Sequence, residues 1–244
     1  MEIQQISSDL FNRDLWTLSP GKTLINTLNA YSFNSAKTNT QFNTSLQNSN
    51  ILLPDGISVV WAVRWITGTH IEKIAGEDLF FYEMERLNLS GGSCFFLGST
   101  ESTLEKIRIK ATNEYPNIKV NSYSPAFKSE FTTADSKVMI DKINSVQPDV
   151  LFIGMTAPKQ EIWAYKYYNQ LKVGHICSIG AVFDFYAGNI KRAPRWMINI
   201  GLEWFYRLIN EPTRLWRRYL IGNLIFIHYI IKEKFGVMKN SVPE

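Results

Sequence analysis

Short apolar runs alternate with stretches of helical periodicity along most of the chain. Residues 94–99 form one such run, and Leu104, Ile107 and Ala111 then recur at the spacing of one helical face. Apolar strands that alternate with helices are typical of a parallel sheet covered on both faces. We therefore predict an α/β fold, a Rossmann-like parallel sheet with helices on both faces. The predicted strands are residues 22–28, 51–54, 94–99, 118–123, 149–155 and 175–180.

Capping residues predict where several of the helices begin. Ser102 and Glu105 form an S-x-x-E pair that predicts one helix start, and Asp135 predicts another. Pro158 suits the first turn of a helix that follows the strand at 149–155. Residues 34–50 are rich in Asn, Thr, Ser and Gln, with apolar residues at near-helical spacing, so we expect one polar-faced helix there.

The C-terminal part of the chain departs from this alternation. Residues 196–209 and 213–235 have helical patterns in which Trp, Phe and Arg are mixed. Their apolar stretch, 219–231, is too short to cross a bilayer but long enough to lie in its interface or to pack on the body. We therefore divide the chain into an α/β body, residues 1–195, and a C-terminal basic and aromatic helical appendage that associates with a membrane, residues 196–244.

Charge is distributed unevenly between these two parts. The 244 residues carry a net charge of +4, but residues 191–244 hold ten Lys and Arg against four acids, a net charge of +6. The remaining residues are therefore at −2, and the asymmetry suggests an anionic partner for the C-terminus. Cys94 and Cys177 both lie in apolar runs, which indicates reduced, buried thiols. With no signal pattern in residues 1–16, we expect a cytoplasmic protein.

Asp55 is the most interesting candidate for chemistry. Ligands of open parallel sheets bind beyond the carboxyl ends of the strands, and Asp55 follows the strand at 51–54 and precedes Gly56. A carboxylate there can act as a general base. It can also cap the helix predicted to start at Ile57, and position alone favours the cap.

Other polar residues follow the later strands. The segment 156–161 starts a helix whose exposed N–H groups, with Lys159, can bind phosphate, although an ordinary connection with a surface lysine fits equally well. Gln160 can bond a sugar or a base, but alone it is more typical of a surface residue. Asp184 lies in apolar surroundings, either as a structural carboxylate paired with tail arginines, the slightly favoured interpretation, or as a substrate ligand.

Three arginines stand together in the C-terminal part. Arg214 shares a helical face with Arg217 or Arg218, and guanidinium groups suit diphosphate oxygens. A solvated basic face is the ordinary alternative. The chain has no D-x-D triplet, no histidine cluster, no G-x-G-x-x-G and no P-loop, so we expect no metal site, no dinucleotide cofactor and no ATPase.

Several long motifs together resemble the bacterial WecG/TagA/CpsF glycosyltransferases, family 26. The resemblance covers about residues 22–225. Lys73 stands where members of this family often carry arginine. The motifs are LPDGISVVWAVRW (53–65), GEDL (76–79), FFLGS (95–99), DVLFIGMTAPKQEIW (149–163), GAVFDFYAGNIKRAP (180–194) and GLEWFYRLINEPTRLWRRYLIGN (201–223).

This resemblance implies an inverting, metal-independent hexosyltransferase without a cofactor. Its donor is a UDP-sugar, and its acceptor is a sugar on undecaprenyl diphosphate, a polyprenyl-diphosphate lipid, at the inner face of the cell membrane. The family's proposed general base falls on Asp55, and residues near the donor fall on Thr27 and Asn29. Gln160 falls at the substrate pocket. The family's appendage arginines, thought to contact diphosphate, fall on Arg214, Arg217 and Arg218.

The identity of the transferred sugar is left open. An N-acetylmannosamine-type or another hexose fits cell-surface polysaccharide or teichoic acid synthesis, whereas UDP-glucose, UDP-galactose or UDP-glucuronate fits capsule or exopolysaccharide synthesis. A nucleic-acid-binding module that uses the basic tail is a remote alternative, because the basic residues are interleaved with Leu, Ile and Phe, and we expect no nucleic-acid partner. A non-catalytic membrane scaffold would not need the polar residues at the strand ends. A homo-oligomer is possible.

Overall fold

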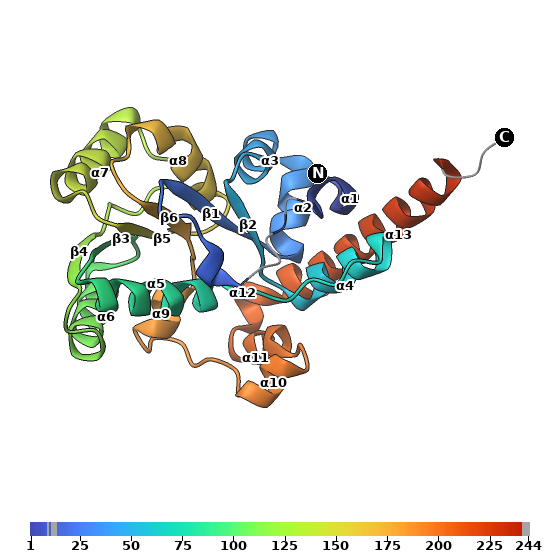
Figure 1. The fold of residues 1–244 in the computed structure, drawn as a ribbon. Helices are drawn as coiled ribbons and strands as arrows, with labels where there is room; N and C mark the ends of the chain where they lie inside the picture. The colour runs from blue at the N-terminus through green and yellow to red at the C-terminus, as the bar shows by residue number, and fades with distance from the viewer. Residues whose placement is uncertain (9, 11–13, 241–244) are drawn as a thin grey trace.

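The computed structural model describes residues 1–8, 10 and 14–240, and its centre is one six-stranded parallel sheet (Figure 1). The spatial order of the strands is β2-β1-β6-β5-β3-β4, with every neighbouring pair parallel. The predicted α/β class and parallel sheet are confirmed. The strands are β1 (Thr23–Leu28), β2 (Ile51–Pro54), β3 (Ser93–Gly98), β4 (Lys119–Tyr123), β5 (Val150–Gly154) and β6 (His175–Ser178).

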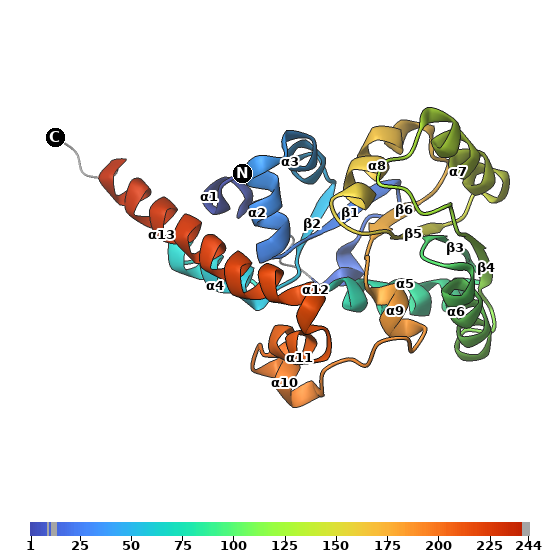
Figure 2. The same cartoon turned by 180° about the vertical axis from the view of Figure 1, so that it is seen from behind.

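Helices cover both faces of this sheet, as the views from the two sides show (Figures 1 and 2). The body helices are α1 (Ile3–Ile6), α2 (Ala30–Thr38), α3 (Thr40–Gln47), α4 (Ile57–Thr67), α5 (Gly76–Ser90), α6 (Glu101–Glu114), α7 (Thr133–Val146), α8 (Lys159–Tyr167) and α9 (Val182–Tyr186). The C-terminal helices are α10 (Arg195–Asn199), α11 (Glu203–Asn210), α12 (Pro212–Trp216) and α13 (Gly222–Asn240), with a π-helical turn at Arg217–Ile221 between the last two.

Alternation along the strands distributes side chains between two core clusters. On β3, Cys94 and Phe96 pack with residues of α5, α6 and α9, whereas Phe95 and Leu97 pack with residues of α7 and α8. Successive side chains of a strand point to opposite faces, so an apolar residue at every position requires a layer on each side. This is why the apolar runs correctly predicted a sheet covered on both faces.

A third cluster joins the two ends of the chain beyond β2. Phe226 and Ile230 of α13 are buried with residues of α1, α2, α3 and α4, and the Phe33 and Phe226 rings lie 5.3 Å apart. Both views show α13 running alongside α4 (Figures 1 and 2). The backbone N–H of Gln4 also donates to Glu233 Oε1, at 2.7 Å. The C-terminal helix is therefore part of the body's packing over this stretch.

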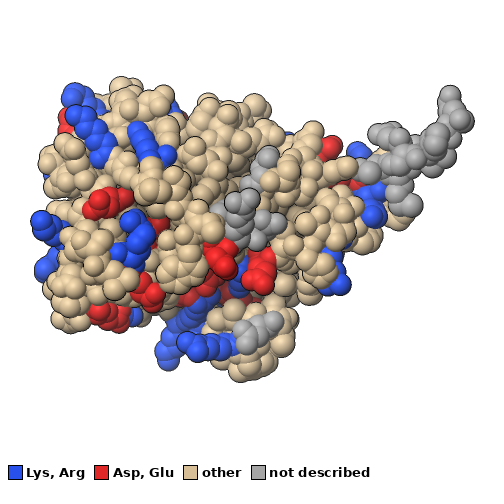
Figure 3. Space-filling model, in the orientation of Figure 1, with Lys and Arg blue, Asp and Glu red and all other residues tan. Residues whose placement is uncertain are grey.

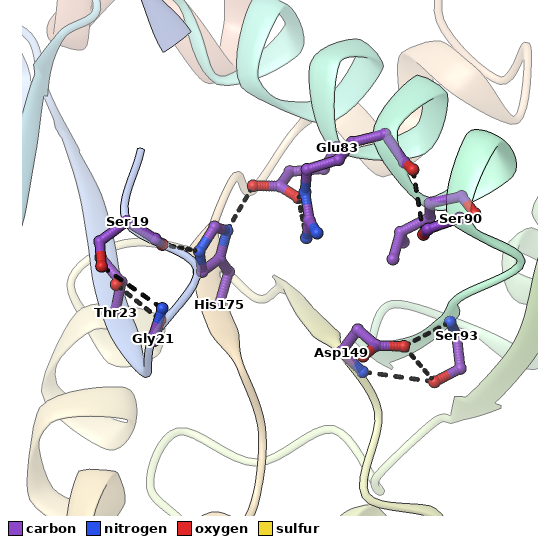
Figure 4. A network of polar contacts seen from close by, with 10 residues as sticks. Ser19, Gly21, Thr23, Glu83, Ser90, Ser93, Asp149 and His175 are labelled. Atoms are coloured by element: carbon purple, nitrogen blue, oxygen red, sulfur yellow. Dashed lines mark hydrogen bonds and ion pairs between the residues drawn. The ribbon is translucent and has the colours of Figure 1, made fainter. Parts of the chain in front are cut away.

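The amino ends of the strands carry a compact polar network (Figure 4). His175 Nδ1 lies 2.5 Å from Glu83 Oε1, and its Nε2 lies 2.7 Å from the Ser19 carbonyl oxygen. Both neighbours are oxygen atoms, so this geometry suits an imidazole that donates from both ring nitrogens. Burial lowers the pKa of His175, but the hydrogen bond and charge of Glu83 outweigh it, and the pKa is raised. Arg86 completes the network with a 2.6 Å ion pair to Glu83.

Some predicted element boundaries were wrong. The stretch 34–50 forms two helices rather than one, because the Asn39 side chain caps α3 by accepting from the Phe42 N–H at 2.9 Å. The cap of α6 is Thr100, not Ser102.

Further corrections concern the next helices along the chain. Thr132 caps α7, with Asp135 completing its capping box. The pattern at 196–209 is divided between α10 and α11, where Gly201 has a φ of +77° that L side chains rarely adopt. Among the described helices, none is both long and apolar enough to cross a membrane.

Candidate active site

The carboxyl ends of the strands open into a cavity of about 1260 Å³. This is larger than the roughly 300–1,000 Å³ typical of a site for one small ligand, and it has room for two substrates. Gly98, at the end of β3, has a φ of +112°, and a Cβ there would lie 2.7 Å from the Gly154 carbonyl oxygen. Glycine is therefore required where β3 and β5 meet at the cavity.

Asp55 lines this cavity directly after β2. Its backbone N–H donates to the Leu28 carbonyl oxygen at 2.9 Å, which holds it beside the end of β1. The N-cap position of α4 is occupied by Gly56, and no side chain caps that helix. The expectation that Asp55 acts as a cap, favoured by its position alone, is wrong, because the helix begins one residue later than a cap at Asp55 would require.

The electrostatic environment of Asp55 suits a proton acceptor. Burial raises the pKa of this carboxyl from 3.8 to about 7, with a further increase from the charge of Glu203. Lys73 and Arg218 act in the opposite direction, and Asp78 adds to the increase. A base whose pKa lies near neutral pH combines an available deprotonated form with useful basicity.

Thr27 and Asn29, the positions that the family resemblance implies near the donor, border the same cavity. Thr27 is buried on β1 opposite Leu53 of β2, and it lines the cavity. Asn29 caps α2, because its side-chain oxygen accepts from the Ser32 N–H at 3.1 Å. This hydrogen bond orients the Asn29 amide at the cavity, next to Asp55.

Gln160 and its neighbour Glu161 form a buried polar pair in the first turn of α8. Gln160 is 4% exposed and Glu161 is 1% exposed, and both line the cavity. Gln160 Nε2 donates to Glu161 Oε1 at 2.8 Å, while Gln160 Oε1 and Glu161 Oε2 have no partner among the described residues. Burial raises the pKa of Glu161 to about 7, against lowering contributions from Gln160 and Arg218. Two buried polar atoms are thus left for a ligand.

Lys159 lines the cavity but its amine is already engaged. Its Nζ donates to the Lys128 carbonyl oxygen at 2.7 Å and lies 4.8 Å from the centre of the Phe131 ring. Burial lowers the pKa of this amine. Lys159 therefore ties the loop before α7 to the start of α8, beside the helix N-terminus that the sequence predicted as a phosphate site.

Asp184 also lines the cavity, half-buried on the short helix α9. Its Oδ1 accepts from Asn189 Nδ2 at 3.2 Å. Within the described part of the chain, no tail arginine pairs with this carboxylate, so the favoured pairing with the tail is not what holds it.

The three predicted arginines are separated by the structure. Arg218 lies over the Tyr31 ring, 4.2 Å from its centre, and lines the cavity with a buried Nε that lacks a partner among the described residues. Arg214 lines the cavity too, and it pairs with Glu211. Arg217 is exposed, stacks over the Trp216 ring at 5.2 Å, and does not line the cavity.

The amino-acid sequence also matches a known protein family. The model of the glycosyl transferase WecG/TagA/CpsF family matches residues 1–240. The chain belongs to this family. An N-acetylglucosaminyldiphosphoundecaprenol N-acetyl-beta-D-mannosaminyltransferase of Bacillus subtilis (strain 168) is 35% identical over 175 residues, which are 72% of this chain and 66% of that protein, slightly under two thirds. The enzyme of the same name from Bacillus spizizenii (strain ATCC 23059 / NRRL B-14472 / W23) is 31% identical over 185 residues, 76% of this chain and 70% of its own.

Sequence reasoning missed part of the site of this WecG/TagA/CpsF family member. Glu203 accepts from Lys73 and from Arg192, both at 3.4 Å, and Arg192 also pairs with Glu77. This network joins the body to α11 at the cavity. Figure 3 shows basic and acidic side chains side by side where α10 and α11 meet the body. Opposite charges far apart in the sequence gave no local signal of this contact.

Arg207 and Glu161 were also missed. Arg207 lines the cavity, packs over the Phe185 ring at 5.2 Å and has a buried Nε without a partner among the described residues. In sequence, Glu161 resembles an ordinary acidic residue of a first helical turn. Among the residues that the structure describes, no group of three or more His, Cys, Asp and Glu could hold a metal ion.

Proposed function

We propose that this protein transfers an N-acetylmannosaminyl group from a UDP-sugar to N-acetylglucosaminyl diphosphoundecaprenol. Membership of the family and the names of its two Bacillus relatives support this substrate pair. The cavity is large enough for a nucleotide-sugar and a lipid-linked sugar together. The observation that carries the proposal is the half-buried Asp55, facing this cavity with a pKa of about 7.

In the proposed reaction Asp55 is the general base. Its carboxylate accepts the proton of an acceptor hydroxyl while that oxygen bonds to the anomeric carbon of the donor. The bond from the anomeric carbon to the diphosphate oxygen breaks, and UDP leaves with the electron pair. Because attack comes from the face opposite the leaving group, the anomeric configuration is inverted.

Arginines supply the positive charge that the departing diphosphate requires. Arg207 presents a buried guanidinium Nε without a partner among the described residues, and Arg214 lines the same cavity. Fixed cations aimed at a developing negative charge stabilise the transition state. We propose that these arginines, with the first turn of α8, do so without a metal ion.

We also propose that the protein attaches to the inner face of the cell membrane through residues 196–244, an appendage to the body of residues 1–195. Exposed apolar side chains of this segment include Trp196, Ile200, Ile209 and Trp216. Basic residues in the same segment, including Arg217 and Lys232, would face anionic lipids, as is typical of interfacial helices. Self-association stays a prediction.

The decisive experiment is Asp55→Asn, assayed with UDP-N-acetylmannosamine and the lipid-linked acceptor. Loss of a general base lowers the rate about 100- to 10,000-fold, so we expect kcat to fall within that range. Asp141→Asn is the matched control, because Asp141 is an exposed carboxylate of α7 paired with Lys137. Near wild-type turnover by Asp55→Asn would show that Asp55 is not the general base.

A donor panel tests the sugar. UDP-N-acetylmannosamine should support transfer, whereas UDP-glucose, UDP-galactose and UDP-glucuronate should not. Preference for any of these three over UDP-N-acetylmannosamine would show that the protein transfers a different sugar by the same reaction.

A further inference from the structure

The cavity that contains Asp55 continues into an apolar channel between α4 and α13. Trp61, Ala62 and Trp65 form its α4 wall, and Phe226, Ile227 and Ile230 form its α13 wall; all six line the cavity. Trp61 is 62% exposed and Trp65 is 47% exposed, so a large part of each indole lacks a protein partner.

Helical periodicity explains why these residues share one wall. On α13, Phe226, Ile227 and Ile230 follow Asn223 at spacings of three, four and seven residues, which places all four on one face. This face extends over about 10 Å of helix, at 1.5 Å per residue. The opposite wall is fixed because α4 begins directly after Asp55 and Gly56.

Polar and apolar groups both line the cavity. Asp55 and the Gln160–Glu161 pair lie at the strand ends, and Arg218 is close enough to affect the pKa values of Asp55 and Glu161. Arg218 belongs to the π-helical turn that leads directly into α13. Arg218 therefore adjoins both the polar groups at the strand ends and the start of α13, whose cavity-lining face is mostly apolar.

We propose that this channel holds the first prenyl units of the acceptor's polyisoprenoid chain. This inference rests on the proposed function. An acceptor whose sugar lies at Asp55 and whose diphosphate lies at Arg218 has its hydrocarbon chain beyond the diphosphate, where the channel begins. Trp61, Trp65 and Ile227 line the cavity and are partly exposed, so a single hydrocarbon chain can pack along them.

Other apolar residues of α13 offer a matched control. Leu224 is 69% exposed on the same helix, but it does not line the cavity. A bilayer or micelle would contact Leu224 at least as readily as the channel residues. A chain bound in the channel would not contact it.

The test compares two acceptors in detergent micelles, one with the undecaprenyl chain and one with a single prenyl unit on the same N-acetylglucosaminyl diphosphate. For the Trp61→Ser/Trp65→Ser double variant, we expect KM for the long-chain acceptor to rise on the order of tenfold. kcat, and all constants for the short acceptor, should stay near wild type. Ile227→Ser, on the opposite wall, should shift KM in the same direction, and Leu224→Ser should not. Thermal unfolding of each variant verifies that it is folded.

The outcomes separate the two proposals. Wild-type turnover of either acceptor supports the proposed function, and its absence with both overturns that function and this inference together. Given turnover, equal losses on long and short acceptors by the Trp61/Trp65 variant overturn the channel, as does no loss on the long one. An effect of Leu224→Ser as large as that of the channel variants assigns these side chains to insertion into the lipid phase instead.

Discussion

The two edges of the sheet both contain buried ionisable groups, but these groups are paired at one edge and lack partners among the described residues at the other. At the amino edge, Glu83 is paired with His175 and Arg86 (Figure 4). At the carboxyl edge, Glu161 Oε2 and Arg218 Nε are buried without a partner among the described residues. Leaving such groups unpaired costs about 1–3 kcal/mol each, and more when they are charged.

This difference distinguishes ionisable groups that stabilise the fold from those that are available to a ligand. A charged group whose hydrogen bonds are all made inside the protein stabilises the fold and has nothing left to offer a ligand. A group held buried and unpaired is maintained against a stability cost, which a ligand can offset by supplying the missing partner. The following predictions test this contrast, in order of decreasing expected effect.

Breaking the amino-edge network should cost the most stability. Glu83→Ala leaves His175 and Arg86 without their partner, and removing one member of a buried ion pair costs about 3–5 kcal/mol. The Tm should fall by roughly 6–20 °C in thermal unfolding at neutral pH. Glu105→Ala, which removes an exposed pair with Arg108, should leave the Tm nearly unchanged. Equal Tm values for the two variants would contradict the contrast.

Removing a cavity arginine should reduce activity without reducing stability. Arg207→Met should lower kcat about 100-fold, the effect of losing one preorganised donor to a developing charge. Its Tm should not fall in proportion, because its guanidinium Nε has no partner to lose. Arg217→Met is the control, since Arg217 is exposed and outside the cavity. Steady-state kinetics in which Arg217→Met is the more damaged variant would show that the wrong arginine faces the substrates.

The pH dependence of activity should report the carboxyl edge. The pKa of Asp55 is raised to about 7 and the base acts deprotonated, so kcat/KM should be constant above pH 7. It should fall tenfold per pH unit below that value. Glu161→Gln should keep this acidic limb, because Glu161 is not the base, and Asp55→Asn should lose it. A limb centred near pH 4 would mean that Asp55 keeps its ordinary pKa.

Local sequence signals were sufficient for the sheet but not for the residues that face the cavity. Apolar runs predicted where the strands lie, and the residues that the carboxyl-edge rule singled out, Asp55 and Gln160, line the cavity. Arg217 and Arg218 are adjacent in sequence, and a small change in helical phase exchanges their exposures. Both arginines lie in the π-helical turn at Arg217–Ile221, which the sequence pattern did not predict.

The sequence by itself determined the α/β architecture, the edge of the sheet at which the cavity opens and the basic character of the C-terminus, because these depend on periodicity and composition within short segments. Only the tertiary structure decided that α13 returns to pack against α2 and α4, that Glu203 meets Lys73 and Arg192, and that Glu161 is buried. Burial and pairing depend on contacts between segments far apart in the chain. The division of the cavity into a polar site, a guanidinium and an apolar channel therefore exists only in the folded protein.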